Sequence, residues 1–437
     1  MQHNAAIGLS AEPQKQDVMA LYRDIAEELA RRIREGLYKP GEKIPSIRQV
    51  AAAFACNKLT VQKAFDALRR DGMIENVVGS GSFVRFPEKI ASGGEVFDFR
   101  TDYISESLFP FETARRIFSE LFDEEGSRAF SPPPVEGDRE LIETLGEFYR
   151  LPTKRMFIVS GAQQGLDLTA KVFSTNIPEA ILFEDPTYPG AISLFKARHF
   201  VPMDADGPNL EALDRKLSPA IKLFYAMPAV HNPTGISYSL QKKEALARRA
   251  GNAPFYLIED DYLSEFTEPS VPRFVDILPE KTIYLKSLSQ TTVSGVRLGA
   301  MIVPEALFEK FIYTKFMSDI ASTGLLQKFA TRFIREGAYG AYIDDTRRRM
   351  EERRRRLAEV IAAHPFLSVP RRQSGYNLWA ASERTVTLPR VPWTPGEEFS
   401  FSPEFRNCFR ISFMHMDDAA FDRGLAYIRD LLPRAFL

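Results

Sequence analysis

The chain has 437 residues, of which 44% are hydrophobic and 26% are charged, and its formal net charge is −1. This composition is typical of a globular protein and excludes a largely disordered, collagen-like or coiled-coil chain. The balanced charge by itself predicts neither a nucleic-acid partner nor a membrane partner. Two cysteines far apart in sequence and five histidines without a close pair indicate no disulfide framework and no metal site.

The N-terminal segment has no basic stretch followed by an apolar one, so we expect no secretory signal. No run of the chain approaches the roughly 18 consecutive apolar residues that a transmembrane helix needs. We therefore expect a cytoplasmic protein that does not interact with a membrane.

Apolar residues spaced three and four positions apart predict three helices near the N-terminus. The first covers residues 17–35 and follows a polar, aperiodic stretch over 1–12, which we expect to be a frayed tail. The second and third helices are shorter and begin after Ser46 and Asn57, whose side chains can cap a helix N-terminus.

A β-hairpin is predicted after the third helix. Residues 73–78 and 82–86 are predicted to be short strands, and Gly79-Ser80-Gly81 between them suits a tight turn. Three helices followed by a hairpin indicate a winged helix-turn-helix over residues 13–86. The small residues of segment 87–96 predict a linker.

The N-terminal sequence resembles the GntR-type winged helix-turn-helix of bacterial transcription regulators. The similar segments are Gly36–Ala51, Asn57–Phe65 and Gly79–Val84. The resemblance implies that this domain binds a double-stranded DNA operator, with base and phosphate contacts from the helices and the wing. The DNA-binding residues that it indicates are Ser46, Arg48, Asn57, Lys58, Thr60, Lys63, Gly79 and Gly81.

Two of these positions depart from the family pattern. Asn57 stands where Ser is usual, but both residues cap a helix, so we expect little change. Lys58 replaces the commoner Arg, so a bidentate guanine contact becomes a point-charge contact. The alternative function for the domain is a winged helix used only for contacts with proteins.

From Phe97 onward, apolar strand-like runs alternate with helical stretches, which predicts an α/β sheet domain over residues 97–437. The expected strands are residues 157–159, 180–183, 223–227, 255–258, 282–285 and 300–303. Ligands of open α/β sheets bind beyond the carboxyl ends of the strands. The loops expected there supply an anion cradle, an aromatic ring, an amide, an acid and an arginine, a set that suits a phosphorylated aromatic heterocycle.

These loops resemble, in order and spacing, those of the fold-type I aminotransferases that use pyridoxal phosphate. Their combination with a winged helix resembles the MocR-like branch of the GntR family. The resemblance implies a large mixed-sheet lobe, a smaller lobe and a homodimer. It also implies Ala162, Gln163, Ser287, Ser289 and Arg297 for the cofactor phosphate, Tyr188, Asn232, Asp260 and Tyr262 for the ring, and Arg410 for a ligand carboxylate.

Two positions in these loops need a decision. Strand alternation allows only one of Asp260 and Asp261 to point into the pocket, and the resemblance favours Asp260. The family has a lysine between Ser289 and Thr291, and this lysine forms a Schiff base with the cofactor; here the residue is Gln290. An amide cannot form an imine, and Lys286 starts on the order of 10 Å away along an extended chain, so we do not expect it to substitute.

The sequence therefore predicts a transcription regulator whose aminotransferase-like domain senses a small ligand without aminotransferase activity. The ligand could be pyridoxal phosphate held non-covalently, an adduct of it, or another phosphorylated or carboxylated metabolite. The alternatives are a pyridoxal-phosphate enzyme that uses Lys286 and a ligand-free scaffold that only dimerises the DNA-binding domains. The arginine-rich stretch 347–356 is predicted to be a solvated helix face.

Overall fold

The computed structural model describes residues 15–34, 38, 44–54, 56–70, 73–77, 81–84, 97–173, 180–267, 272–370, 372–386, 388 and 391–436. The chain divides into two compact units, Met1–Val96 and Phe97–Leu437. The predicted tail over 1–12, the predicted linker over 87–96 and the wing residue Gly79 lie outside the described residues.

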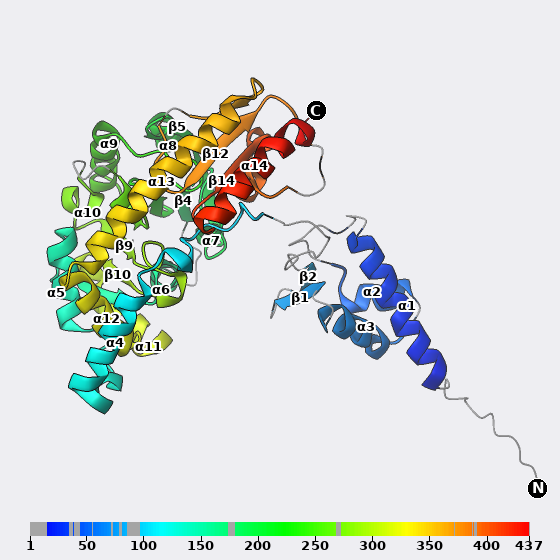
Figure 1. Ribbon diagram of the computed structural model, residues 1–437, viewed down its shortest axis with the longest axis horizontal. Helices are drawn as coiled ribbons and strands as arrows, with labels where there is room; N and C mark the ends of the chain where they lie inside the picture. Colours follow the sequence, from blue (N-terminus) through cyan, green and yellow to red (C-terminus); the bar gives the residue numbers. More distant parts are fainter. Residues whose placement is uncertain are drawn as a thin grey trace, which may run out of the picture. The chain divides into compact units, whose positions relative to one another are not determined.

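The first unit contains the three predicted helices and the predicted hairpin (Figure 1). Its two strands pair antiparallel, with Ile74 opposite Val84. Val61 and Phe65 lie on one face of the third helix and are buried against Ile25 of the first helix and the hairpin, so the amphipathic pattern supplies a single core. The elements are α1 (Lys15–Arg34), α2 (Ile47–Ala53), α3 (Lys58–Arg70), β1 (Ile74–Val77) and β2 (Gly81–Val84).

The second unit is built on an eight-stranded mixed sheet with the order β3-β10-β9-β8-β7-β4-β5-β6. Five consecutive strands from β9 to β5 are parallel, whereas β10 is antiparallel to both of its neighbours. The bounds are β3 (Met156–Val159), β4 (Ala180–Asp185), β5 (Ala197–Asp204), β6 (Gly207–Pro208), β7 (Ile221–Ala226), β8 (Tyr256–Asp261), β9 (Thr282–Ser287) and β10 (Gly299–Ile302).

Alternate residues of the central strands enter two different cores. In β4, Ile181 and Phe183 belong to the main core, while Leu182 belongs to a second one. In β8, Ile258 and Leu257 are divided in the same way. Because side chains alternate along a strand, helices must cover both faces of the sheet, which explains why the central strands are buried throughout.

Helices surround this sheet (Figure 1). α6 contacts β3, β9 and β10. α8 contacts β5, and α10 contacts β8 and β9. The α-helices of the large lobe are α4 (Phe111–Glu125), α5 (Arg139–Tyr149), α6 (Ala162–Phe173), α7 (Pro189–Ile192), α8 (Leu210–Lys216), α9 (Leu240–Gly251), α10 (Phe274–Ile277), α11 (Phe308–Asp319) and α12 (Gly324–Arg335).

A smaller antiparallel sheet with the order β11-β12-β14-β13 forms the second lobe. The long helix α13 contacts α12 of the large lobe as well as α14, β11 and β12 of the small lobe, so it links the two (Figure 1). The predicted α/β fold with a large mixed-sheet lobe and a smaller lobe is confirmed. The bounds here are α13 (Ala338–Ala362), β11 (Leu367–Ser368), β12 (Asn377–Ser382), β13 (Thr394–Pro395), β14 (Cys408–Ser412) and α14 (Asp418–Ala435).

Short 3-10 helices complete the second unit. They are η1 (Glu106–Leu108), η2 (Gly126–Phe130), η3 (Ser264–Phe266), η4 (Ser294–Val296), η5 (Glu305–Leu307), η6 (Gly396–Glu398) and η7 (Pro403–Phe405). Within the described ranges, no helix has the length and apolar character needed to cross a membrane.

Candidate functional site

Polar residues gather where the parallel strands of the large sheet end. β4, β7, β8 and β9 run in the same direction, so their carboxyl ends meet at one edge. β3 also ends at this edge, because it is antiparallel to β10, which is itself antiparallel to β9. The residues predicted from the sequence that follow or end these strands are Ala162, Gln163, Tyr188, Asn232, Asp260 and Ser287.

Asp260 is a buried acid at the end of β8, with 4% of its surface exposed. Its Oδ2 atom accepts a hydrogen bond of 2.7 Å from the Tyr225 hydroxyl, and its Oδ1 atom has no hydrogen-bond partner among the described residues. Burial raises the pKa of this carboxyl to about 7. Asp260 therefore offers one unused buried acceptor to a ligand.

Asp261 faces away from Asp260. Its Oδ1 atom lies 3.1 Å from the Lys286 ammonium, which is also 2.7 Å from Glu265 Oε2. Burial alone would raise the pKa of the Asp261 carboxyl, but the Lys286 charge and a hydrogen bond from Tyr284 outweigh it, so this pKa lies below its usual value. The pairing keeps the Lys286 amine in a buried ionic cluster.

Strand alternation explains why these groups separate. β8 and β9 are parallel neighbours in which Asp261 is opposite Lys286 and Asp260 is opposite Leu285. Lys286 thus shares a face with Asp261, while Ser287 shares the other face with Asp260. Lys286 also makes a cation–π contact, with its nitrogen 5.0 Å from the centre of the Tyr149 ring.

Gln290 lies just after β9 and is half-buried. Its side-chain oxygen accepts a hydrogen bond of 2.5 Å from the Tyr376 hydroxyl. The same hydroxyl lies 3.0 Å from the backbone carbonyl of Asp102. Gln290, which the sequence predicts at the position of the family's lysine, is therefore part of a hydrogen-bonded group rather than a free side chain.

The loop from β3 into α6 approaches Arg297 closely. Gly161 has a φ angle of +84°, and a Cβ atom there would lie 3.2 Å from a terminal nitrogen of Arg297. That same nitrogen donates to the Ser160 carbonyl at 3.2 Å. Ala162 then begins α6, whose first N–H groups point toward the loop, so glycine, guanidinium and helix N-terminus form a cradle suited to an anion.

Two more residues predicted for the phosphate have local hydrogen bonds. Gln163 Nε2 donates to the Gly190 carbonyl at 3.2 Å, and Gln163 Oε1 is 3.3 Å from the Tyr188 hydroxyl. Ser289 is buried, and its hydroxyl makes only a long contact of 3.4 Å to the Leu298 carbonyl. The Ser289 hydroxyl can thus turn to a ligand at little cost.

Tyr188 lies among the charged groups of the site. Burial raises the pKa of its hydroxyl to about 12, and the negative charges of Asp102 and Asp260 add to the shift. The positive charges of Arg297 and Arg410 act in the opposite direction and lower this pKa. The structure therefore brings the acid, the aromatic residue and both arginines to one place.

Asn232 and Arg410 are in direct contact. Arg410 Nη1 donates to Asn232 Oδ1 at 2.9 Å and to Asp102 Oδ2 at 2.7 Å. Tyr262 is buried nearby, and burial raises the pKa of its hydroxyl above the ordinary value. This hydroxyl has Asn377 as a polar neighbour, but the two do not meet hydrogen-bond geometry.

Sequence reasoning missed Asp102, Tyr225 and Tyr376. Tyr225 lies within a predicted strand, two positions from another apolar residue, and that pattern indicates a core residue. Tyr376 and Asp102 lie far from the loops that carry the resemblance. The one available sign of a site residue was the Asp102 carboxylate near the start of the domain. Its partner Arg410 is 308 positions away, so the sequence did not indicate the pairing.

The N-terminal unit positions its predicted DNA contacts on α2 and α3. Ser46 caps α2 with a capping box to Gln49. Arg48, Lys58 and Lys63 are exposed and form no ion pair with any residue in the described ranges. Exposed cations without an acidic partner suit phosphate contacts.

Two further predicted contacts interact with one another. Asn57 Oδ1 accepts hydrogen bonds from the Thr60 backbone nitrogen at 2.8 Å and from the Thr60 hydroxyl at 2.9 Å. Asn57 is exposed, whereas only 2% of Thr60 is exposed. The Thr60 hydroxyl thus serves the helix cap in this structure, and its contact with DNA stays a prediction, as does that of Gly81 at the start of β2.

Comparisons with protein-family models divide the chain in the same two parts. Residues 104–428 match the family described as aminotransferase class I and II, and residues 21–84 match bacterial regulatory proteins of the gntR family. The chain belongs to the aminotransferase class I and II family. The predicted combination of a GntR-type winged helix-turn-helix with an aminotransferase-like domain is confirmed.

Similar proteins of known or assigned class include regulators. The chain is 29% identical over 360 residues to the HTH-type transcriptional regulator YcxD of Bacillus subtilis (strain 168), covering 79% of this chain and 81% of the relative. It is 24% identical over 435 residues to the probable rhizopine catabolism regulatory protein MocR of Rhizobium meliloti, covering 89% and 87%.

Among solved structures, the fold is similar to that of LysN, the alpha-aminoadipate aminotransferase of Thermus thermophilus. That structure holds N-(5'-phosphopyridoxyl)-L-leucine. The TM-score is 0.70 at 23% sequence identity, and the similarity covers 78% of this chain and 92% of LysN. At this identity the comparison shows the fold of the aminotransferase class I and II family.

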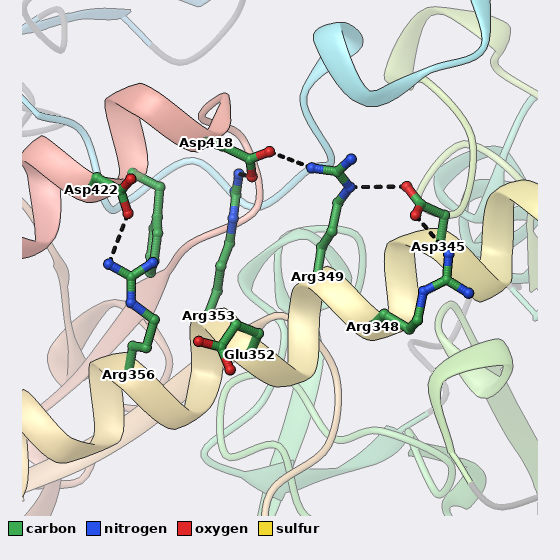
Figure 2. A pocket seen from close by; sticks show the side chains of 9 residues that line it. Asp345, Arg348, Arg349, Glu352, Arg353, Arg356, Asp418 and Asp422 are labelled. Atoms are coloured by element: carbon green, nitrogen blue, oxygen red, sulfur yellow. Dashed lines mark hydrogen bonds and ion pairs between the residues drawn. The ribbon is translucent and has the colours of Figure 1, made fainter.

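In this aminotransferase-family domain, the arginine-rich stretch of α13 borders a surface cleft of about 370 Å³. Figure 2 shows Arg349 between Asp345 and Asp418, while Arg356 reaches Asp422 on α14 at 2.7 Å. Four arginines and four acidic residues line the cleft, so their charges cancel. The cleft is therefore a contact between α13 and α14 rather than an anion site.

The prediction of a solvated helix face is wrong for the buried residues of this stretch, which include Met350 and Arg353. Arg353 is 3% exposed and donates to the Phe413 carbonyl at 3.0 Å, to the Met416 carbonyl at 2.8 Å and to Asp418 at 2.7 Å. The arginine is buried because α14 packs over it, an arrangement that charge patterning within one helix does not reveal.

Proposed function

We propose that this protein is a DNA-binding transcription regulator whose aminotransferase-like domain binds a small ligand without catalysing amino-group transfer. The gntR-family match over residues 21–84 and the relatives named as regulators support the DNA-binding part. The exposed cations on α2 and α3 support contacts with phosphate. Operators are bound by two-fold dimers in many helix-turn-helix proteins, which fits a homodimer.

The ligand that the pocket suits best is pyridoxal phosphate, bound non-covalently. Asp260 carries this proposal, because its Oδ1 atom is buried and lacks a hydrogen donor that a protonated pyridine nitrogen would supply. Tyr188 offers a ring face, and the Gly161 loop with Arg297 offers an anion cradle. Asn232 and Tyr262 would then hydrogen-bond the ring hydroxyl.

When bound to an enzyme of this kind, pyridoxal phosphate acts as an electron sink for bonds around an amino-acid Cα atom. That chemistry also needs an amine that can take and return protons beside the ring. Here Gln290 has a neutral amide, and the Lys286 amine is held by Asp261 and Glu265 on the opposite face. The chain's own residues therefore support binding and orientation of a ligand, and not amino-group transfer.

A homodimer is supported by an exposed apolar stripe on α11. The stripe consists of side chains three and four positions apart that are between 51% and 67% exposed: Tyr313, Phe316, Met317 and Ile320. The C-terminal end of α11 is tied to the first turn of α6, because Asp319 accepts from Gln164 at 2.6 Å. A second copy on this stripe would thus lie beside the phosphate cradle.

The test uses the full-length protein. An operator is selected from genomic fragments, and its affinity is then measured by mobility shift with and without pyridoxal phosphate. We expect saturable binding of pyridoxal phosphate, no adduct after borohydride reduction, and a changed operator affinity. If neither pyridoxal phosphate nor the Asp260→Ala substitution changed the operator affinity, the result would favour a ligand-free dimerisation scaffold instead. A borohydride-trapped adduct with turnover of an amino acid would favour an enzyme.

A further inference from the structure

The buried cation of Arg410 already has a carboxylate partner from its own chain. The Arg410 side chain is 6% exposed, and its Nη1 atom donates to Asp102 Oδ2 at 2.7 Å and to Asn232 Oδ1 at 2.9 Å. Its Nη2 atom donates to the Arg100 carbonyl at 3.0 Å. The guanidinium carbon lies 4.9 Å from the centre of the Phe399 ring. A counter-charge, three hydrogen bonds and an aromatic ring are thus supplied to Arg410 within the fold.

Asp102 is held at this position by its neighbours in the chain. Its backbone carbonyl lies 3.0 Å from the Tyr376 hydroxyl, whose shorter contact is with Gln290. Upstream, the Phe99 carbonyl accepts from the Ser412 nitrogen at 2.8 Å, which attaches the segment to β14 beside Arg410. Between Phe99 and Asp102, the Arg100 backbone nitrogen donates a hydrogen bond to the Asp98 carboxylate. The Asp102 carboxylate is therefore presented to the guanidinium by an ordered segment.

The carboxylate also faces the rings of the pocket. About a third of the Asp102 side chain is exposed (33%). After burial, its negative charge is the largest cause of the raised pKa of Tyr188, Tyr262 and Tyr376. The three tyrosines lie in separate loops, before α7, after β8 and before β12, and the Asp102 charge acts on all of them.

A ligand carboxylate on Arg410 would have to share the guanidinium with Asp102. Two carboxylates on one buried cation leave a net negative charge where little water screens it, and like charges repel strongly there. Both hydrogens of Nη1 are already used, and Nε is the one guanidinium nitrogen without a hydrogen-bond partner in the described part of the chain. Three of the five N–H donors of Arg410 are thus occupied, so a second carboxylate could reach only the Nε hydrogen and the remaining Nη2 hydrogen, and it would be repelled by Asp102 there.

We propose that Asp102 occupies the carboxylate subsite of Arg410, so that the pocket takes a phosphorylated pyridine whose side group carries no carboxylate. This inference rests on the proposed pyridoxal-phosphate site and narrows its ligands to the aldehyde or an amine. Adducts of the cofactor with amino acids are rejected.

Isothermal titration of the full-length protein tests the inference with three probes: pyridoxal phosphate, pyridoxamine phosphate and N-(5'-phosphopyridoxyl)-L-alanine. Only the third carries a carboxylate. The same titrations are made on Asp102→Asn, which removes the charge and keeps the side-chain shape. Glu106→Gln is the matched control, because it removes an exposed carboxylate from the same segment.

We expect the wild type to bind pyridoxamine phosphate at least about tenfold more tightly than phosphopyridoxyl-alanine. Asp102→Asn should lose most of this preference by gaining affinity for the carboxylated probe, and Glu106→Gln should keep it. The wild-type comparison stands even if Asp102→Asn folds poorly.

Equal affinity of the wild type for the two probes would overturn the inference. The inference would also be overturned if Asp102→Asn kept the wild-type preference for pyridoxamine phosphate over phosphopyridoxyl-alanine. If pyridoxal phosphate still bound in that case, the proposed cofactor site would remain valid. Failure of the wild type to bind any of the three probes would overturn both the site and the inference.

Discussion

The Gln290 side-chain oxygen lies 2.5 Å from the Tyr376 hydroxyl. The same hydroxyl lies 3.0 Å from the Asp102 carbonyl. Tyr376 therefore connects two residues that differ from what a reaction with an amino-acid substrate would need. One is the amide of Gln290, at the position where the sequence resemblance implies a lysine, and the other is the Asp102 carboxylate on Arg410. Both features support the proposed binding of a ligand without reaction with an amino acid.

Restoring a lysine at position 290 should restore covalent attachment. The Gln290→Lys variant is expected to form an adduct with pyridoxal phosphate that borohydride reduction traps and mass spectrometry detects at residue 290, because a primary amine can form an imine and an amide cannot. Gln290→Met serves as a matched control of similar length. An adduct in the wild type, at Lys286 or elsewhere in the pocket, would contradict the prediction.

Replacing Asp260 by Asn should stabilise the protein above neutral pH. Burial raises the pKa of this carboxyl from 3.8 to about 7, so the folded state holds its proton more tightly than the unfolded state does. The folded wild type therefore loses stability as pH rises from about 4 to about 7, and the loss is complete above that range.

The Asn side chain carries no such penalty and can still accept from Tyr225. We expect Asp260→Asn to gain on the order of 2–4 kcal/mol over the wild type at pH 8 and to match it near pH 5. Denaturant unfolding at the two pH values measures this difference. A variant that is less stable than the wild type at pH 8 would refute the account of Asp260.

Lys286 should matter for stability and not for ligand binding. Its removal in Lys286→Met leaves Asp261 and Glu265 buried without their cation, which costs about 3–5 kcal/mol in comparable cases. The control is Lys171→Met, whose ion pair with Asp167 is exposed and worth at most about 1 kcal/mol. Urea unfolding provides the energies. A loss of pyridoxal-phosphate affinity without a loss of stability would reverse the assignment.

Each exposed cation of the DNA-binding unit should contribute to the salt dependence of operator binding. Substituting Arg48, Lys58 or Lys63 by Ala is expected to weaken binding and to reduce the slope of log affinity against log salt by about 0.9 for each phosphate that the side chain neutralises. Arg69→Ala on the same helix is the control, because Arg69 pairs with Asp66. Unchanged slopes in all three variants would favour a domain that contacts proteins.

The stripe on α11 should hold the dimer together. Introducing a charge with Phe316→Glu or Met317→Glu is expected to shift the protein toward monomers in analytical ultracentrifugation, because the charge would be buried in the interface. Leu240→Glu, at an exposed apolar residue that begins α9, should leave the distribution unchanged. Monomeric wild-type protein at all concentrations would contradict the dimer.

Much of the fold could be predicted from local patterns. The three N-terminal helices follow the 3.6-residue period, and the caps at Ser46 and Asn57 are formed by their own short-range hydrogen bonds. All six predicted strands of the large sheet are present, but two further strands were missed: β5, whose alternating, partly exposed residues resemble a loop, and β6, which is only two residues long. The four strands of the small sheet were not predicted either, and two of them, β11 and β13, are only two residues long.

The site divides in the same way. Alternation along β8 sufficed to separate Asp260 from Asp261, since side-chain direction in a strand is a local property. The sequence by itself also determined that Gln290 cannot bond covalently to a cofactor, because that depends only on the chemistry of one side chain. The tertiary structure alone decided that Arg410 meets Asp102 and that Arg353 is buried, because these contacts join residues that are 308 and 65 positions apart and arise only when separate elements pack.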